Sequence, residues 1–241
     1  MAHMFAEITK EAVASALRSF RSHGVSPIKP YLNISRAFFP GEEVWLLDAL
    51  AGTPLAGFLS LPGVVYVEPD EEHIYSVSRP LLWRDIYPFG TRSLSLGRQL
   101  LPREVGVTAL PNIMAQVDVP RAHALGVTGR GTIILIVDTG VEGDRIPDEN
   151  KGGGWTDDPD GDPWSDQVGH GTMVALIALA VAPGASIFSV KLRPGPNGGL
   201  MKESVMSAVE ALVPVIEADP GLRLVMNNSW GTLGCQGEPY W

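Results

Sequence analysis

The run Ile133–Gly140, which reads Ile-Ile-Leu-Ile-Val-Asp-Thr-Gly, decides the fold that this sequence predicts. Five apolar and mostly β-branched residues lead without interruption into Asp138, Thr139 and Gly140. A short apolar run bounded by Gly131 and Gly140 is typical of a strand that is buried on both faces of a parallel sheet. An Asp followed by a Gly turn at the carboxyl end of such a strand lies where open α/β sheets hold their chemistry.

A second polar group follows further along the chain, where Gly169-His170-Gly171-Thr172 opens an apolar segment that predicts a helix over His170–Val181. A serine nucleophile needs a His to take its proton and a buried carboxylate to orient that His. Asp138 and His170 are therefore the candidate catalytic residues. Taken singly, each is less specific, because Asp-Thr-Gly also marks aspartic proteases and a lone His beside glycines is a common helix-start residue.

From Ala109 onward, strand patterns alternate with helix patterns, which predicts an α/β fold with a parallel sheet and right-handed crossovers. The expected strands are Ile133–Val137, Ala185–Leu192 and Leu222–Met226, and the expected helices are Pro120–Ala124, His170–Val181 and Glu203–Ile216. Pro214 is expected to kink the last turn of the third helix or to end it early.

Residues 5–76 predict a small α+β domain, residues 77–107 a linker, and residues 108–241 the α/β domain. Within the small domain a helix is expected between Thr9 and Gly24, and a second helix behind Thr53-Pro54 with Leu55, Phe58 and Leu59 packing inward. The expected strands are Leu32–Phe39, Glu43–Leu47 and Val64–Val67. Met1–Met4 is interpreted as a remnant of cloning.

Composition excludes several functional classes. Eighteen basic and 27 acidic residues give a net charge of −9, which argues against nucleic acid or an anionic membrane surface as a partner. The single cysteine, Cys235, excludes a disulfide within the chain and a zinc site of several thiolates. No cofactor and no metal are expected, and Asp157–Asp162 is interpreted as a solvated acidic loop, with a hard cation as the alternative. The N-terminus lacks the pattern of a secretory signal peptide, which favours a cytoplasmic location, whereas a removed leader would make the protein secreted.

Two blocks around the candidate residues resemble a known family. Gln116–Gly143, with Asp138, resembles the aspartate block of the subtilisin-like serine proteases (subtilases), and Val168–Ala175, with His170, resembles their histidine block. The resemblance implies a doubly wound parallel sheet, here incomplete, and a serine endopeptidase that acts on a peptide or protein substrate. Leu61–Asp70 resembles the end of the subtilase propeptide, which assists folding and plugs the active site; a generic α+β module is the alternative.

The same resemblance implies a groove for an extended substrate, whose backbone would pair with the enzyme like an added strand. Pro196–Leu200 matches one wall of this groove, and Asn228–Gly231 matches the other. The implied substrate-binding residues are Gly198, Gly199, Leu200, Ser229, Trp230 and Gly231.

The blocks that carry the oxyanion-hole Asn and the nucleophilic Ser have no match in these 241 residues. This chain alone is therefore expected not to hydrolyse peptides, and a C-terminal fragment of the same protease is the expected partner. The alternatives are a truncated chain stabilised by oligomerisation and a catalytically inactive subtilase-like module with a binding or regulatory role.

Overall fold

The computed structural model describes residues 2–70, 72–73, 109–195 and 200–230, and the chain divides into two compact units. The first unit comprises Met1–His73 and Gly195–Pro220, and the second comprises Ile74–Pro194 and Gly221–Trp241. The predicted linker at 77–107 lies outside the described residues, and the predicted domain limits remain predictions. Among the described helices, none is long and apolar enough to cross a bilayer.

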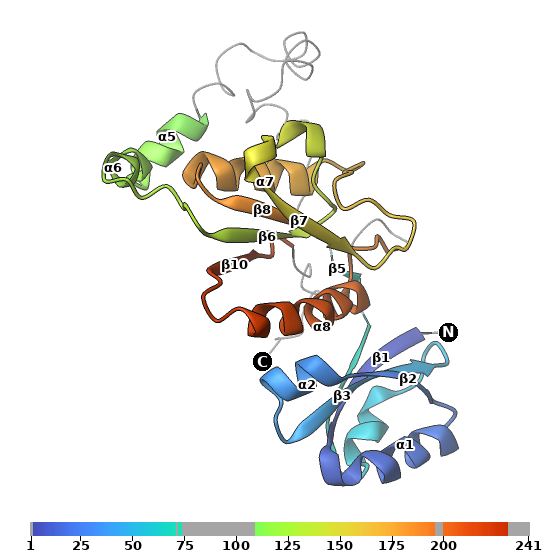
Figure 1. Cartoon of the computed structure of the whole chain (residues 1–241). Helices are drawn as coiled ribbons and strands as arrows, with labels where there is room; N and C mark the ends of the chain where they lie inside the picture. The colour runs from blue at the N-terminus through green and yellow to red at the C-terminus, as the bar shows by residue number, and fades with distance from the viewer. Residues whose placement is uncertain (1, 71, 74–108, 196–199, 231–241) are drawn as a thin grey trace. The chain divides into compact units, whose positions relative to one another are not determined.

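The first unit is built on an antiparallel sheet in the order β2-β3-β1-β4 (Figure 1). Its strands are β1 (Ala2–Thr9), β2 (Ser26–Tyr31), β3 (Glu42–Ala49) and β4 (Val64–Pro69). Side chains alternate along β1, so that Met4, Ala6 and Ile8 join one core cluster and Phe5 joins the other. The sheet therefore buries both faces.

Different helices fill these two clusters. Short η1 (Lys10–Ala12) leads into α1 (Val13–Ser22), which buries Leu17 and Phe20 in the first cluster beside Phe58 of η2 (Leu55–Ser60). In the second cluster, α2 (Leu32–Phe38) contributes Ile34, and α8 (Lys202–Ala218) packs Met206 and Val209 against it. The short strands β5 (Glu72–His73) and β9 (Leu200–Met201) pair antiparallel.

Two expectations for this unit are wrong. Leu32–Phe39 is a helix rather than a strand, and Leu59 is 48% exposed instead of packing inward. Residues 2–4 are part of β1, and Met4 is almost fully buried, while their interpretation as a remnant of cloning remains a prediction. Helix α8 continues past Pro214 to Ala218, so Pro214 does not end it, and the alternative of a kink in the last turn remains a prediction.

Glu210 explains why Leu32–Phe38 is helical although its sequence pattern favoured a strand. The residue before α2, Tyr31, makes no side-chain capping bond to the helix in the described structure. Instead, the two carboxylate oxygens of Glu210 accept the backbone N–H groups of Asn33 and Ile34 at 2.8 and 2.9 Å. A carboxylate at a helix N-terminus satisfies the unpaired amides and interacts favourably with the helix dipole. The cap of α2 thus comes from a residue far away in the sequence.

Glu210→Gln is expected to speed amide hydrogen exchange in α2 about 5–30-fold, which corresponds to a loss of about 1–2 kcal/mol. The amide can offer one oxygen to the two N–H groups and carries no charge. Glu217→Gln is the matched control on the same helix, because Glu217 pairs with exposed Arg36 rather than with backbone amides. Equal exchange rates in the two variants would contradict the capping role.

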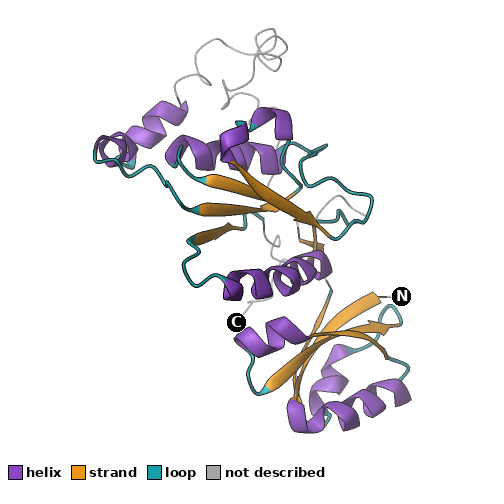
Figure 2. Ribbon diagram, viewed as in Figure 1, coloured by secondary structure: helices purple, strands orange, loops and turns teal. Residues whose placement is uncertain are grey.

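The second unit contains a four-stranded sheet in the order β10-β6-β8-β7, with every neighbouring pair parallel (Figure 2). Its strands are β6 (Ile133–Asp138), β7 (Lys151–Thr156), β8 (Ser186–Lys191) and β10 (Leu224–Asn227). Helix α7 (His170–Val181) packs Val174 and Ala175 against Ile136 and Ile187 of the sheet. The predicted α/β class with a parallel sheet is confirmed.

The buried strand predicted from the opening run is β6, which lies between β10 and β8 and is buried from Ile134 to Asp138. Two short helices precede it, α5 (Ala109–Gln116) and α6 (Val119–Ala124). The single turns η3 (Gly143–Arg145) and η4 (Asp148–Asn150) connect it to β7. The order of the sheet places the carboxyl end of β6 in the interior of the unit, where Asp138 lies.

Candidate active site

Asp138 and His170 meet inside the second unit. Asp138 is the last residue of β6 and is fully buried, and His170 is the first residue of α7 and is 5% exposed. Nδ1 of His170 lies 2.8 Å from Oδ1 and 3.0 Å from Oδ2 of Asp138. Since an ionised carboxylate only accepts hydrogen bonds, the proton of the ring lies on Nδ1 and Nε2 is left as the basic nitrogen. This arrangement suits a histidine that takes a proton from a nucleophile.

Two glycines allow this close approach of β6 and α7. A Cβ on Gly171 would collide with the carbonyl oxygen of Gly140 and would lie 3.0 Å from Cβ of Asp138. Gly140 itself has φ +102°, a conformation that L side chains rarely adopt, and a Cβ there would collide with the carbonyl oxygen of Ser165. The glycines that flank the candidate residues in the sequence are therefore required by packing.

Asp166 organises the start of α7, and the sequence analysis did not single it out. The residue is 8% exposed, and its carboxylate accepts five hydrogen bonds. The donors are the backbone N–H groups of Val168, Gly169 and Thr172 and the hydroxyls of Thr139 and Thr172, at 2.6–3.2 Å. An Asp shortly before a predicted helix is a recognisable capping signal. Through these bonds, Asp166 holds the backbone on both sides of His170.

Thr139 couples this network to the end of β6. Its backbone N–H donates to Oδ1 of Asp138 at 2.8 Å, and its hydroxyl accepts the N–H of Gly171 at 3.1 Å. The same hydroxyl donates to Asp166. The Asp138 carboxylate is thus oriented by the residue next to it, while the start of α7 is tied to the same strand end.

The six predicted substrate-binding residues lie in different parts of the chain, and three of them are outside the described residues. Gly198, Gly199 and Gly231 lie outside the described residues. Leu200 is buried in β9 of the first unit, where it pairs with β5. In the second unit, Oγ of Ser229 donates to Asn227 at 2.7 Å, and the indole N–H of Trp230 donates to the carbonyl of Val137 at 2.7 Å. Trp230 therefore lies beside the strand end that carries Asp138, and the substrate-binding role of all six remains a prediction.

Comparison with known proteins gives a family match that covers this site. Residues 129–240 match the family model Peptidase_S8, described as the subtilase family. This match covers slightly less than half of the chain, which is similar to the subtilase family over these residues. The matched segment contains β6, α7, β8, α8 and β10, so it includes both Asp138 and His170.

Individual relatives agree with this family. Bacillopeptidase F of Bacillus subtilis (strain 168) is 24% identical over 261 residues, which cover 96% of this chain and 18% of that protein. Subtilisin Savinase of Lederbergia lenta is 32% identical over 111 residues, 42% of this chain and 40% of that protein. The major intracellular serine protease of Bacillus subtilis (strain 168) is 33% identical over 133 residues, 48% of this chain and 42% of that protein. The chain thus spans less than half of the length of each of these three relatives.

Proposed function

We propose that this protein is part of a subtilisin-like serine endopeptidase that hydrolyses peptide bonds with an Asp-His-Ser triad. The observation that carries the proposal is the contact of both Asp138 oxygens with Nδ1 of His170 in a buried site. In the reaction His170 accepts the proton of the serine hydroxyl and later donates it to the leaving amine. Asp138 holds the imidazole in the required tautomer and stabilises the imidazolium.

The nucleophilic serine is proposed to come from sequence outside these 241 residues, such as a C-terminal fragment that completes the sheet. Two serines near the sheet have other partners, since Ser189 donates to the carbonyl of Pro163 and Ser229 donates to Asn227. The substrate is proposed to be an extended peptide that runs along Gly198–Leu200 and Ser229–Gly231.

The N-terminal part is proposed to act as a propeptide that keeps the enzyme a zymogen. Support comes from the first unit, where the N-terminal sheet packs against α8, a helix within the segment that matches the subtilase model. Further support is the pairing of β5 with β9, because β9 begins at Leu200 of the proposed substrate wall. The residues after β4 would then pair with this wall in the way that a substrate does.

A serine-directed fluorophosphonate tests the proposed function. In the natural protein that contains this chain, the reagent is expected to label one serine outside residues 1–241. The isolated 241-residue chain is expected to remain unlabelled, as mass spectrometry of the intact chain would show. Labelling of a serine within residues 1–241 would contradict the assignment. No labelling in either sample would instead favour a catalytically inactive binding or regulatory module.

A further inference from the structure

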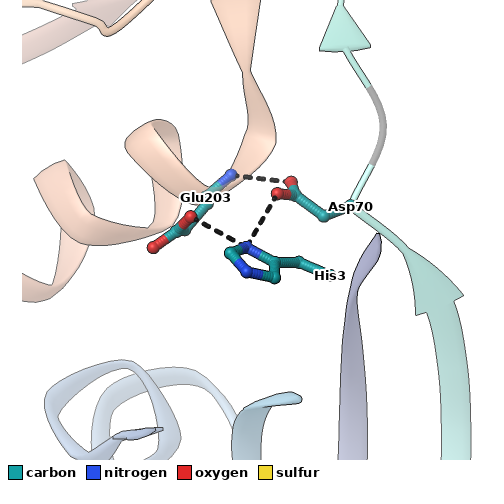
Figure 3. Close-up of side chains that lie close together, drawn as sticks. All are labelled: His3, Asp70 and Glu203. Carbon is teal, nitrogen blue, oxygen red and sulfur yellow. Dashed lines mark hydrogen bonds and ion pairs between the residues drawn. The ribbon is translucent and has the colours of Figure 1, made fainter. Parts of the chain in front are cut away.

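Three potential metal ligands converge within the first unit, apart from the Asp138 and His170 pair (Figure 3). His3 lies on β1, Asp70 directly follows β4, and Glu203 is in the first turn of α8. Nδ1 of His3 is 3.3 Å from Oε2 of Glu203 and 3.9 Å from Oδ2 of Asp70. Three segments that are distant in sequence therefore contribute one ligand atom each to a small volume.

Each carboxylate in this cluster is oriented through one of its two oxygens. Oδ1 of Asp70 accepts the backbone N–H of Glu203 at 3.0 Å, and Oε1 of Glu203 lies 3.8 Å from Nζ of Lys29. The other oxygens, Oδ2 of Asp70 and Oε2 of Glu203, are the atoms that approach His3. Orientation of ligand side chains by outer hydrogen bonds and charges is a general feature of metal sites.

Asp70 supplies an independent indication of a missing partner. Its side chain is 1% exposed, and Oδ2 is buried without a hydrogen-bond partner among the described residues. A buried carboxylate oxygen in this state is costly. Burial, together with the charge of Glu203, raises the pKa of Asp70 against the opposing effect of the Glu203 backbone N–H. A cation at this point would offset both the lost hydration and the repulsion between the carboxylates.

We propose that His3, Asp70 and Glu203 form a binding site for a divalent transition-metal ion, with Zn²⁺ as the best match. One imidazole nitrogen, two carboxylate oxygens and a water make a four-coordinate donor set that zinc commonly uses. Bond lengths of about 2.0–2.2 Å give a tetrahedron with edges of about 3.4 Å. The ligand atom of His3 lies 3.3 and 3.9 Å from the two carboxylate oxygens, and all three atoms lie within 4.8 Å of one another, so they would draw together around the ion. Ca²⁺ and Mg²⁺ prefer oxygen ligands alone.

The bound ion would join the N-terminal sheet to the start of α8, which is a function beyond the proposed proteolysis. His3 is 39% exposed, so the ion can reach the cluster from solvent. Because the ligands come from β1, the end of β4 and α8, removal of the ion with a chelator should loosen the attachment of α8 to the sheet. The metal would thus strengthen an attachment that Glu210 and the apolar cluster also provide.

Isothermal titration of ZnCl₂ into the chelator-treated 241-residue chain at neutral pH tests this proposal. One equivalent is expected to bind, and Asp70→Asn or Glu203→Gln is expected to weaken that binding at least about tenfold. Glu217→Gln, on the same helix but outside the cluster, and His23→Gln, at another exposed histidine, are expected to bind zinc like the unchanged chain. Both cluster variants conserve shape, and the amide introduced by Asp70→Asn would keep an oxygen for the N–H of Glu203.

A thermal unfolding series provides the second measurement. Saturating zinc is expected to raise the unfolding midpoint of the unchanged chain and of the two controls, and to leave the midpoints of Asp70→Asn and Glu203→Gln unshifted. Far-UV circular dichroism identifies any variant that does not fold, and the other cluster variant then decides. Absence of zinc binding by the unchanged chain, or unaltered affinity in a folded cluster variant, would overturn the proposal.

Discussion

Asp138→Asn is expected to lower kcat for peptide hydrolysis about 10⁴-fold in the complete enzyme, with the fold retained. In subtilisin, removal of the catalytic aspartate lowers kcat about 3 × 10⁴-fold, and the expected figure for Asp138 is taken from that protein. An amide presents a single oxygen, which the N–H of Thr139 already uses, and its NH₂ group would face Nδ1 of His170. This arrangement favours the tautomer with the proton on Nε2, which cannot accept the proton of a serine. The amide also carries no charge to stabilise the imidazolium.

Steady-state kinetics on a peptide substrate measures this effect, and Asp144→Asn is the matched control. Asp144 lies in η3 of the same unit with its side chain 78% exposed, and its variant is expected to retain kcat. In the isolated chain, proton NMR offers a readout that needs no serine, because the hydrogen-bonded Nδ1 proton of His170 should be visible far downfield and should disappear in Asp138→Asn. A decrease in kcat below tenfold, with circular dichroism unchanged, would refute the proposed role of Asp138.

The part of the fold that sequence predicts best is the part that carries the candidate site. The apolar run before Asp138 has no polar residue that could face solvent, so a strand buried on both faces was the structure it favoured, and β6 is that strand. The helix that begins at His170 follows from its apolar composition after a Gly. Because the carboxyl end of a parallel strand and the start of a following helix lie at the same edge of a sheet, the two side chains were expected to meet.

The errors occur where distant residues decide the local structure. Leu32–Phe38 is helical because Glu210, far along the chain, caps its N-terminus. Strand β7 was not predicted because it contains three consecutive glycines, which have low strand propensity. A Cβ at Gly154 would lie 2.7 Å from Pro163, so close packing rather than propensity selects glycine at that position. Neither cause can be read from the local sequence pattern.

Asp166→Ala is expected to produce the largest loss of stability in the second unit, about 3 kcal/mol or more in the free energy of unfolding. The substitution removes an acceptor that serves five donors, and it leaves the part-buried N–H of Gly169 and the buried N–H of Thr172 without that acceptor. Hydrogen bonds to a charged group each contribute about 1.5–3 kcal/mol, and only part of this is regained from water at a site that is 8% exposed. For a chain of this length the loss corresponds to a decrease of about 6–12 °C in Tm.

Calorimetry or thermal circular dichroism measures this decrease, and Asp160→Ala, an exposed acid in the loop that precedes Asp166, is the control with little expected change. A positioning role adds a second expectation. Because Asp166 holds Gly169 and Thr172 on either side of His170, its loss should speed solvent exchange of the Nδ1 proton of His170 below the unfolding temperature. A large decrease in Tm with unchanged exchange of that proton would mean that Asp166 stabilises the unit without positioning His170. If neither quantity changes, the five hydrogen bonds are not the interactions that hold the start of α7 against β6.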